Sequence, residues 1–175
     1  ANRLGISNIR IELEELCFSA KHPMRSRLIQ KAVKAARGNR SELVEQISET
    51  MKKRLKEEGL KARVMGREKH MYSIYRKMKE QSKSFNQIMD VYGFRIIVDN
   101  ADSSYRALGF IHNLYKPVPG RFKDYIAIPK ANGYQSLHTT VVGVGGVHIE
   151  IQIRTEDMEA MAHNGIAAHW LYKDE

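Results

Sequence analysis

The stretch VHIEIQIR at residues 147–154 decides the expected fold. Four apolar residues alternate along it with four polar ones, and a period of two predicts a β-strand with one apolar and one polar face. The polar residues are His148, Glu150, Gln152 and Arg154. On its own the pattern is typical of a strand with one solvated face. A functional interpretation needs a second acidic group close to Glu150.

Further strands are predicted upstream of this one, at 61–64, 94–98, 125–128 and 137–142. Helices are predicted between and after them, at 68–79, at 103–115 and from 155 to about 172. Strand-rich stretches that are separated and flanked by helices favour a mixed α+β sheet over a helical bundle.

The first 58 residues carry apolar residues at helical spacing in three runs. The second run follows Pro23, Gly38 is a plausible stop, and Ser41 is a good start signal for the third. Gly59 ends this region. We therefore expect a helical lead-in over 1–59 and a mixed α+β domain over 60–175.

The composition points to an anionic partner. The chain has 175 residues, and 29 lysines and arginines against 20 acidic residues give a net charge of +9. Hydrophobic residues make up 42%, an ordinary value that argues against disordered and fibrous classes. The basic balance favours nucleic acid, a membrane surface or a polyphosphate nucleotide.

Cys17 is the only cysteine, so an internal disulfide is excluded and a reducing, cytoplasmic setting is expected. The longest run without acidic residues, lysine or arginine is 131–149, and polar residues interrupt it throughout. Neither a membrane-spanning helix nor a signal peptide is therefore predicted. From its two ends, we expect the chain to be a segment of a longer protein.

Asp90 is the second acidic group that the polar strand face requires. It precedes the predicted strand at 94–98, and sites in α/β proteins often lie at such strand ends. Together with Glu150 it could hold Mg²⁺ against a triphosphate, because Mg²⁺ takes few protein ligands and substrate oxygens. An aspartate in front of a strand is also a common turn residue.

Residues 61–83 are strongly basic, with eight cationic residues against two acidic ones. Lys69, Ser73 and Lys77 lie four apart, on one face of the predicted helix. Gly66 and Arg67 come just before it, so the helix N-terminus and the cations could bind phosphates. A solvated basic face and an RNA-binding surface are the alternatives.

A third stretch, 120–138, interleaves glycine and proline with cations and aromatic residues. Its cations could bind a second anion, and Tyr134 offers a flat surface for a base. The relevant residues are Arg121, Lys123, Tyr125, Lys130, Asn132, Tyr134, Gln135 and His138. Together the three regions indicate an enzyme that binds two nucleotides.

Four stretches resemble the synthetase domain of the RelA/SpoT family, in the family's order. They are GREKHMYSIYRKM at 66–78, DVYGFRIIV at 90–98, GRFKDYIAIPKANGYQSLHTT at 120–140 and EIQIRT at 150–155. The resemblance covers 61–175 almost without a break, and 1–59 looks like the segment that precedes this domain in long members. It implies a nucleotidyltransferase-like mixed β-sheet flanked by helices, preceded by a helical segment.

The resemblance also implies an activity: transfer of the β,γ-pyrophosphate of ATP to the 3′-hydroxyl of GDP or GTP, giving ppGpp or pppGpp and AMP. The metal would be Mg²⁺, held by Asp90 and Glu150, with Glu150 also a candidate base. The residues implied for ATP are Arg67 and Arg95 on the adenine, and Lys69, Ser73 and Lys77 on the phosphates. Those implied for GDP or GTP are Tyr134 and Asn132 on the guanine, Arg121, Lys123, Lys130 and His138 on the phosphates, and Gln152.

One assignment conflicts with regular strand geometry. Asp90 and Arg95 are an odd number of residues apart, which points their side chains to opposite faces. We expect a bulge at Gly93 to resolve this.

The form Arg121-Phe122-Lys123-Asp124 resembles the bifunctional synthetase/hydrolase branch of the family, so a hydrolase domain upstream and regulatory domains downstream are expected in the parent chain. No histidine is followed by aspartate, so the family's hydrolase site is not expected here. We expect neither membrane binding nor sequence-specific nucleic acid binding. A silenced synthetase domain that binds guanine nucleotides, and a basic RNA-binding module, remain as alternative hypotheses.

Overall fold

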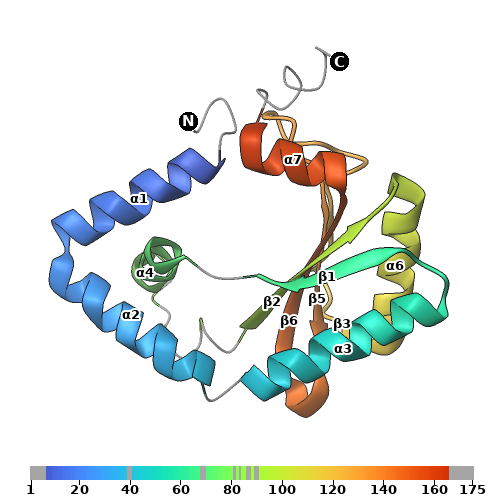
Figure 1. The fold of residues 1–175 in the computed structure, drawn as a ribbon, viewed down its shortest axis with the longest axis horizontal. Helices are drawn as coiled ribbons and strands as arrows, with labels where there is room; N and C mark the ends of the chain where they lie inside the picture. The colour runs from blue at the N-terminus through green and yellow to red at the C-terminus, as the bar shows by residue number, and fades with distance from the viewer. Residues whose placement is uncertain are drawn as a thin grey trace.

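A mixed sheet forms the centre of the fold (Figure 1). The computed structural model describes residues 7–38, 41–67, 70–80, 82, 84, 85, 88 and 91–165. The strands are β1 (Ala62–Gly66), β2 (Val91–Val98), β3 (Lys116–Pro117), β4 (Lys123–Asp124), β5 (Leu137–Val142) and β6 (His148–Thr155). Their order is β1-β2-β6-β5-β3, and β4 also pairs with β5. The β2–β6 pair is parallel and the other pairs are antiparallel, which confirms the mixed sheet.

Helices cover both faces of this sheet and extend beside it. They are α1 (Ser7–Lys21), α2 (Pro23–Gly38), α3 (Ser41–Glu57), α4 (Met71–Glu80), α6 (Ala101–Leu114) and α7 (Glu156–Asn164), with a short 3₁₀ turn η1 (Val144–Gly146). Figure 1 shows α3 and α7 on opposite sides of the strands, while α1, α2 and α4 lie together away from them. The predicted last helix begins where expected, but α7 ends at Asn164, because its C-cap Gly165 has a φ of 64° and leaves the helical conformation. The predicted continuation from 166 to Tyr172 lies outside the described residues.

The apolar face of β6 builds the main core. Ile149, Ile151 and Ile153 are at most 1% exposed, as the alternation predicts. They pack with Phe94 of β2 and with residues of α3 and α6, such as Met51 and Ile111. Burial of each such side chain stabilises the fold by about 1.5–3 kcal/mol, so this face fixes the register of the central strand.

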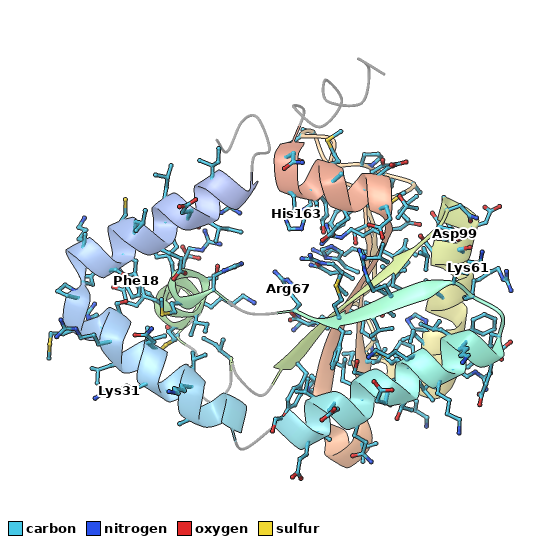
Figure 2. All side chains as sticks on the ribbon, viewed as in Figure 1. Phe18, Lys31, Lys61, Arg67, Asp99 and His163 are labelled. Carbon is cyan, nitrogen blue, oxygen red and sulfur yellow. The ribbon has the colours of Figure 1, made fainter. Side chains whose placement is uncertain are left out.

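A second, smaller core holds α1, α2 and α4 together. It consists of the buried residues Phe18, Ile29, Val33, Ile74 and Ile88. Figure 2 shows Phe18 pointing from α1 toward α4. Helix α3, in contrast, shares its buried residues with the sheet. The expected division of the chain at Gly59 stays a prediction.

The predicted strand at 125–128 is wrong, because these residues form turns after the two-residue strand β4. The carboxylate of Asp124 accepts hydrogen bonds from the backbone N–H groups of Ile126 and Ala127, both at 2.9 Å. A side chain that satisfies two successive donors favours a turn over a strand ladder. The short strand β3 is not predicted from the sequence, because the proline at 117 lacks a backbone N–H and argues against a strand.

The predicted bulge at Gly93 is also wrong. Strand β2 pairs with β6 residue for residue from Val91 to Val98. The glycine has a different role, because a Cβ atom there would lie 3.3 Å from the Arg67 backbone oxygen and 3.4 Å from the Arg67 Cβ. Gly93 thus allows the segment after β1 to approach β2 closely.

In the part of the chain that the structure describes, no helix is long and apolar enough to span a bilayer.

Helix α6 begins at an N-cap whose loss should be measurable. The Asn100 side chain accepts a hydrogen bond of 2.8 Å from the Ser103 backbone N–H. We expect Asn100→Ala to lower the free energy of unfolding by about 1 kcal/mol, measured by urea denaturation. Asn113→Ala, on an exposed position of the same helix, is the matched control, and equal loss in both variants would contradict the capping role.

Candidate functional site

The strand register gathers polar residues on the sheet face opposite the main core. In β6, Glu150 lies level with Gly93 of β2 and Thr140 of β5, while Gln152 lies level with Arg95 and His138. Residues that pair in register point to the same side of a sheet. The alternation in β6 therefore builds a polar face shared by three strands, and Arg95 reaches it without any bulge.

Helix α7 covers one end of this face and supplies a shared carboxylate. Glu159 forms ion pairs with Arg95 of β2 and with Arg154 of β6, the latter with 2.7 Å between Oε2 and Nε. His163 completes the group, with its Nε2 2.7 Å from Glu159 Oε1. We call these four residues the Glu159 cluster. Figure 2 shows His163 on α7, on the side toward Arg67 and the sheet.

Burial makes the Glu159 cluster unusual. The side chains of Arg154, Glu159 and Arg95 are 3%, 13% and 20% exposed. Burial lowers the pKa of the Arg154 guanidinium, and a buried charge without a counterion is strongly destabilising. Arg95 Nε, Arg154 Nε, Arg154 Nη1 and Glu159 Oε2 are buried with no hydrogen-bond partner among the described residues, so Arg154 and Glu159 attract each other as charges without hydrogen-bond geometry. Each arginine therefore keeps an unused donor.

An aromatic and basic cluster lies beside Arg154. The Tyr134 cluster, as we call it, contains Tyr125, Lys130, Tyr134 and His138. The Lys130 Nζ lies 4.6 Å and 4.9 Å from the ring centroids of Tyr125 and Tyr134, and Arg154 Cζ lies 5.6 Å from the Tyr134 centroid. Cations that contact one ring from two residues hold it in place.

His138 is neutral in this cluster. Burial lowers its pKa to about 4, and the charges of Lys130, Arg154, Arg67 and Lys123 act in the same direction. The Tyr134 Oη lies 2.7 Å from His138 Nε2. Because the imidazole is neutral, its Nε2 can accept a hydrogen bond that the Tyr134 hydroxyl donates.

Turns on both sides shape the loop that carries the Tyr134 cluster. Partial burial raises the pKa of Asp124, but hydrogen bonds from Ala127, the Tyr105 hydroxyl and Ile126 outweigh it and lower the pKa overall. Gly133 has a φ of 76°, which only glycine adopts without strain. The Asn132 side-chain oxygen lies 3.3 Å from the Tyr134 backbone nitrogen, so it is already engaged locally.

The remaining predicted residues divide into three groups. Arg67 follows β1 beside Gly93, and its charge reaches His138 and Arg154. Arg121 and Lys123 are exposed, and Lys123 pairs in register with His138. Ser73 and Lys77 lie on α4, which packs against α1 and α2.

Lys69 and Asp90 lie outside the described residues, so their predicted roles stay predictions.

Sequence reasoning missed Glu159 and His163 and did not assign Arg154 to the site. Arg154 stands in the alternating strand, so its place on the polar face was readable. Glu159 and His163 are four apart, the spacing that puts two side chains on one helical face. Which strand that face meets is not encoded in the spacing.

The residues present suit the predicted Mg²⁺. The described residues contain no group of three or more potential metal ligands, but Mg²⁺ needs only one or two carboxylates when substrate phosphates supply the other oxygens. Glu150 is half-buried on the polar face, and its side chain forms no hydrogen bond or ion pair with any described residue. Its carboxylate is thus available, and Mg²⁺ itself stays a prediction.

The lowered pKa of His138 predicts a pH-dependent stability. An unfolded histidine takes up a proton near pH 6.5, whereas the folded one resists until about pH 4, so stability falls as the pH falls between these values. We expect the free energy of unfolding to drop by about 2 kcal/mol more in the wild type than in His138→Gln between pH 6.5 and 4.5, by urea denaturation. His148→Gln, which changes an exposed histidine, should keep the wild-type dependence.

Comparisons with known proteins identify the family of the chain. The family model described as "Region found in RelA / SpoT proteins" matches residues 66–175. A Vibrio cholerae protein named guanosine-3′,5′-bis(diphosphate) 3′-pyrophosphohydrolase is 61% identical over 99% of this chain and 24% of its own length. The Escherichia coli bifunctional (p)ppGpp synthase/hydrolase SpoT is 59% identical over 99% and 25%. The chain spans about a quarter of these curated relatives.

Among solved structures, the small alarmone synthetase 1 of Bacillus subtilis bound to its product pppGpp is similar, with a TM-score of 0.60 and 26% identity. The match covers 82% of each chain. The family model matches more than half of the residues. The order of the four motifs and the mixed sheet with one polar face point to the same family. The chain therefore belongs to the RelA/SpoT family and contains the region that is typical of it.

Proposed function

We propose that the chain is a (p)ppGpp synthetase domain, which transfers the pyrophosphate of ATP to the 3′-hydroxyl of GDP or GTP and releases AMP. The observation that carries this proposal is the polar face, where an available carboxylate, Glu150, stands on the same side of the sheet as Arg95 and the Tyr134 cluster. Relatives named for synthesis and for hydrolysis of (p)ppGpp support a guanine nucleotide as substrate.

The donor nucleotide would bind at the β1–β2 side of the face. Arg67 and Arg95 would hold the adenine between two planar guanidinium groups, which stack well on aromatic rings. Ser73 and Lys77 of α4, with Lys69 before it, would bind the triphosphate. Positive charge is required here because ATP brings several negative charges.

The acceptor nucleotide would bind at the β5 side. Tyr134 would stack on the guanine, and the contacts of its ring with Lys130 and Arg154 would fix its orientation. Asn132 and Gln152 would contact the base or ribose. Its phosphates would be held by Arg121, Lys123, Lys130 and His138.

The reaction requires positioning and charge neutralisation more than a special nucleophile. The 3′-oxygen of the acceptor forms a bond to the β-phosphorus of ATP, the bond between that phosphorus and the α-phosphate oxygen breaks, and AMP leaves. Glu150 would take the proton from the 3′-hydroxyl. Mg²⁺, held by Asp90 and Glu150, would neutralise phosphate charge when bound.

A silenced domain is the second candidate. Arg95 is engaged by Glu159 and His163, and α4, which carries Ser73 and Lys77, packs against α1 and α2. Donor binding would therefore need a rearrangement. In the parent protein, expected in the cytoplasm, a hydrolase domain upstream and regulatory domains downstream would set whether it occurs.

Replacement of the Glu150 carboxylate tests the proposed synthesis. We expect the wild type with γ-labelled ATP, GDP or GTP, and Mg²⁺ to give a labelled tetra- or pentaphosphate on thin-layer chromatography. Glu150→Gln should lose at least a hundredfold in rate, because it removes both a metal ligand and the proton acceptor. Removal of Mg²⁺ should stop the reaction.

The control for this assay is Glu49→Gln, an exposed surface change on α3. A wild type that binds GDP without making product would contradict autonomous synthesis and favour the silenced domain. Binding that ignores Glu150 but weakens steeply with salt would favour an RNA-binding module.

Tyr134 provides a separate test of the acceptor side. Loss of a stacking ring costs about 1–3 kcal/mol, so Tyr134→Leu should raise the KM for GDP about tenfold or more and leave the KM for ATP nearly unchanged. Tyr134→Phe, which keeps the stacking ring and removes only the hydroxyl that lies 2.7 Å from His138 Nε2, is the matched control and should keep the KM for GDP close to that of the wild type. Equal effects on both KM values would argue against base stacking at Tyr134.

A further inference from the structure

Glu159 is the one acidic residue in the described part of the chain that pairs with arginines of two different strands. It contacts Arg95 of β2 and Arg154 of β6 from a helix that lies above both. These arginines stand on neighbouring strands of the polar face, and each contacts a different part of the site. Arg95 stands on the β2 side with Arg67, and Arg154 contacts the Tyr134 ring.

We propose that Glu159 is a positioning residue that holds Arg95 and Arg154 together and so links the donor and acceptor sides of the site. This inference rests on the proposed function, because it assigns nucleotides to the two sides. Glu159 touches neither nucleotide itself in this assignment. It acts through the two guanidinium groups.

The charges of the cluster explain why one carboxylate can do this. Two guanidinium groups that share a buried site repel each other, and the carboxylate between them offsets this repulsion. The hydrogen bond that Arg95 Nη1 donates to Glu159 Oε1 is charge-assisted and therefore directional, and it fixes the Arg95 guanidinium. Arg154 is held by its ion pair with the other carboxylate oxygen. Glu159 thereby holds the Arg95 guanidinium on the β2 side and keeps Arg154 against the Tyr134 ring.

The surroundings of Glu159 also favour a dedicated role. Its neighbour on the same helix, Glu156, pairs with Arg63 at 2.9 Å, but there both side chains are more than half exposed. Exposed pairs contribute little, whereas a carboxylate that neutralises buried arginines cannot be lost without consequence. The two positions on α7 thus give a functional variant and a matched control.

The test measures binding separately for each nucleotide. Wild type, Glu159→Gln and Glu156→Gln are titrated calorimetrically with GDP and with an ATP analogue that carries a methylene group between its α- and β-phosphates. We expect Glu159→Gln to raise the Kd of both ligands roughly tenfold, the effect of about one charge-assisted hydrogen bond. Glu156→Gln should bind both like the wild type.

A second substitution separates positioning from general loosening of the fold. Arg95→Lys should weaken only the ATP analogue. A third variant, Arg95→Met, removes the charge that pairs with Glu159. Adding Glu159→Gln to Arg95→Met should weaken GDP as before but add little to the loss for the ATP analogue, because the interaction is already broken. Equal additional losses for both ligands would indicate a merely structural role and overturn the proposal.

The outcomes distinguish this inference from the proposed function. A wild type that binds neither nucleotide removes the proposed function and the inference with it. A wild type that binds both, with Glu159→Gln binding them equally well, overturns the inference alone. If Glu159→Gln does not fold, Glu159→Asp replaces it: the shorter carboxylate keeps the charge but not both contacts, so unchanged affinity for both ligands would also overturn the proposal.

Discussion

The parallel pairing of β2 with β6 is the constraint on which the site depends. Its register runs without interruption over eight residues of each strand and sets Gly93 beside Glu150 and Arg95 beside Gln152. The isoleucines of β6 hold that register, because a slip of one residue would turn them out of the core. The same alternation that buries three isoleucines therefore aims the polar residues at one shared surface.

That surface combines two kinds of electrostatic environment. Around Glu159, positive charge is compensated and buried, and the groups are held rigidly. Glu150 and the exposed cations Arg121 and Lys123 form no ion pair within the part of the chain that the structure describes. Fixed charges such as those around Glu159 need little reorganisation when a charged ligand binds, which suits the proposed reaction between two polyphosphates.

The sequence predicted the parts that depend on local pattern. Alternation in 147–154 located β6, and the run at 137–142 located β5. The helix predicted at 103–115 is α6, which begins two residues earlier, at Ala101, after the Asn100 cap. It failed where a side chain replaces a backbone partner, as Asp124 does in the turn that was predicted as a strand. It also missed Glu159, since the partner of a helical carboxylate 64 residues away from Arg95 depends on how the helix docks.

Helix α4 packs with helices α1 and α2, whereas other proposed site residues lie on the sheet. It is anchored in the core of Phe18, Ile29, Val33, Ile74 and Ile88, while its Ser73 and Lys77 are the groups assigned to the donor phosphates. The protein thus has two cores, one of helices and one on the sheet, and the triphosphate would contact residues of both. Packing in this helical core therefore sets the distance between α4 and the sheet. A change such as Ile74→Val, which removes one methyl group from this core, would shift α4 and weaken the binding of ATP without changing the strands.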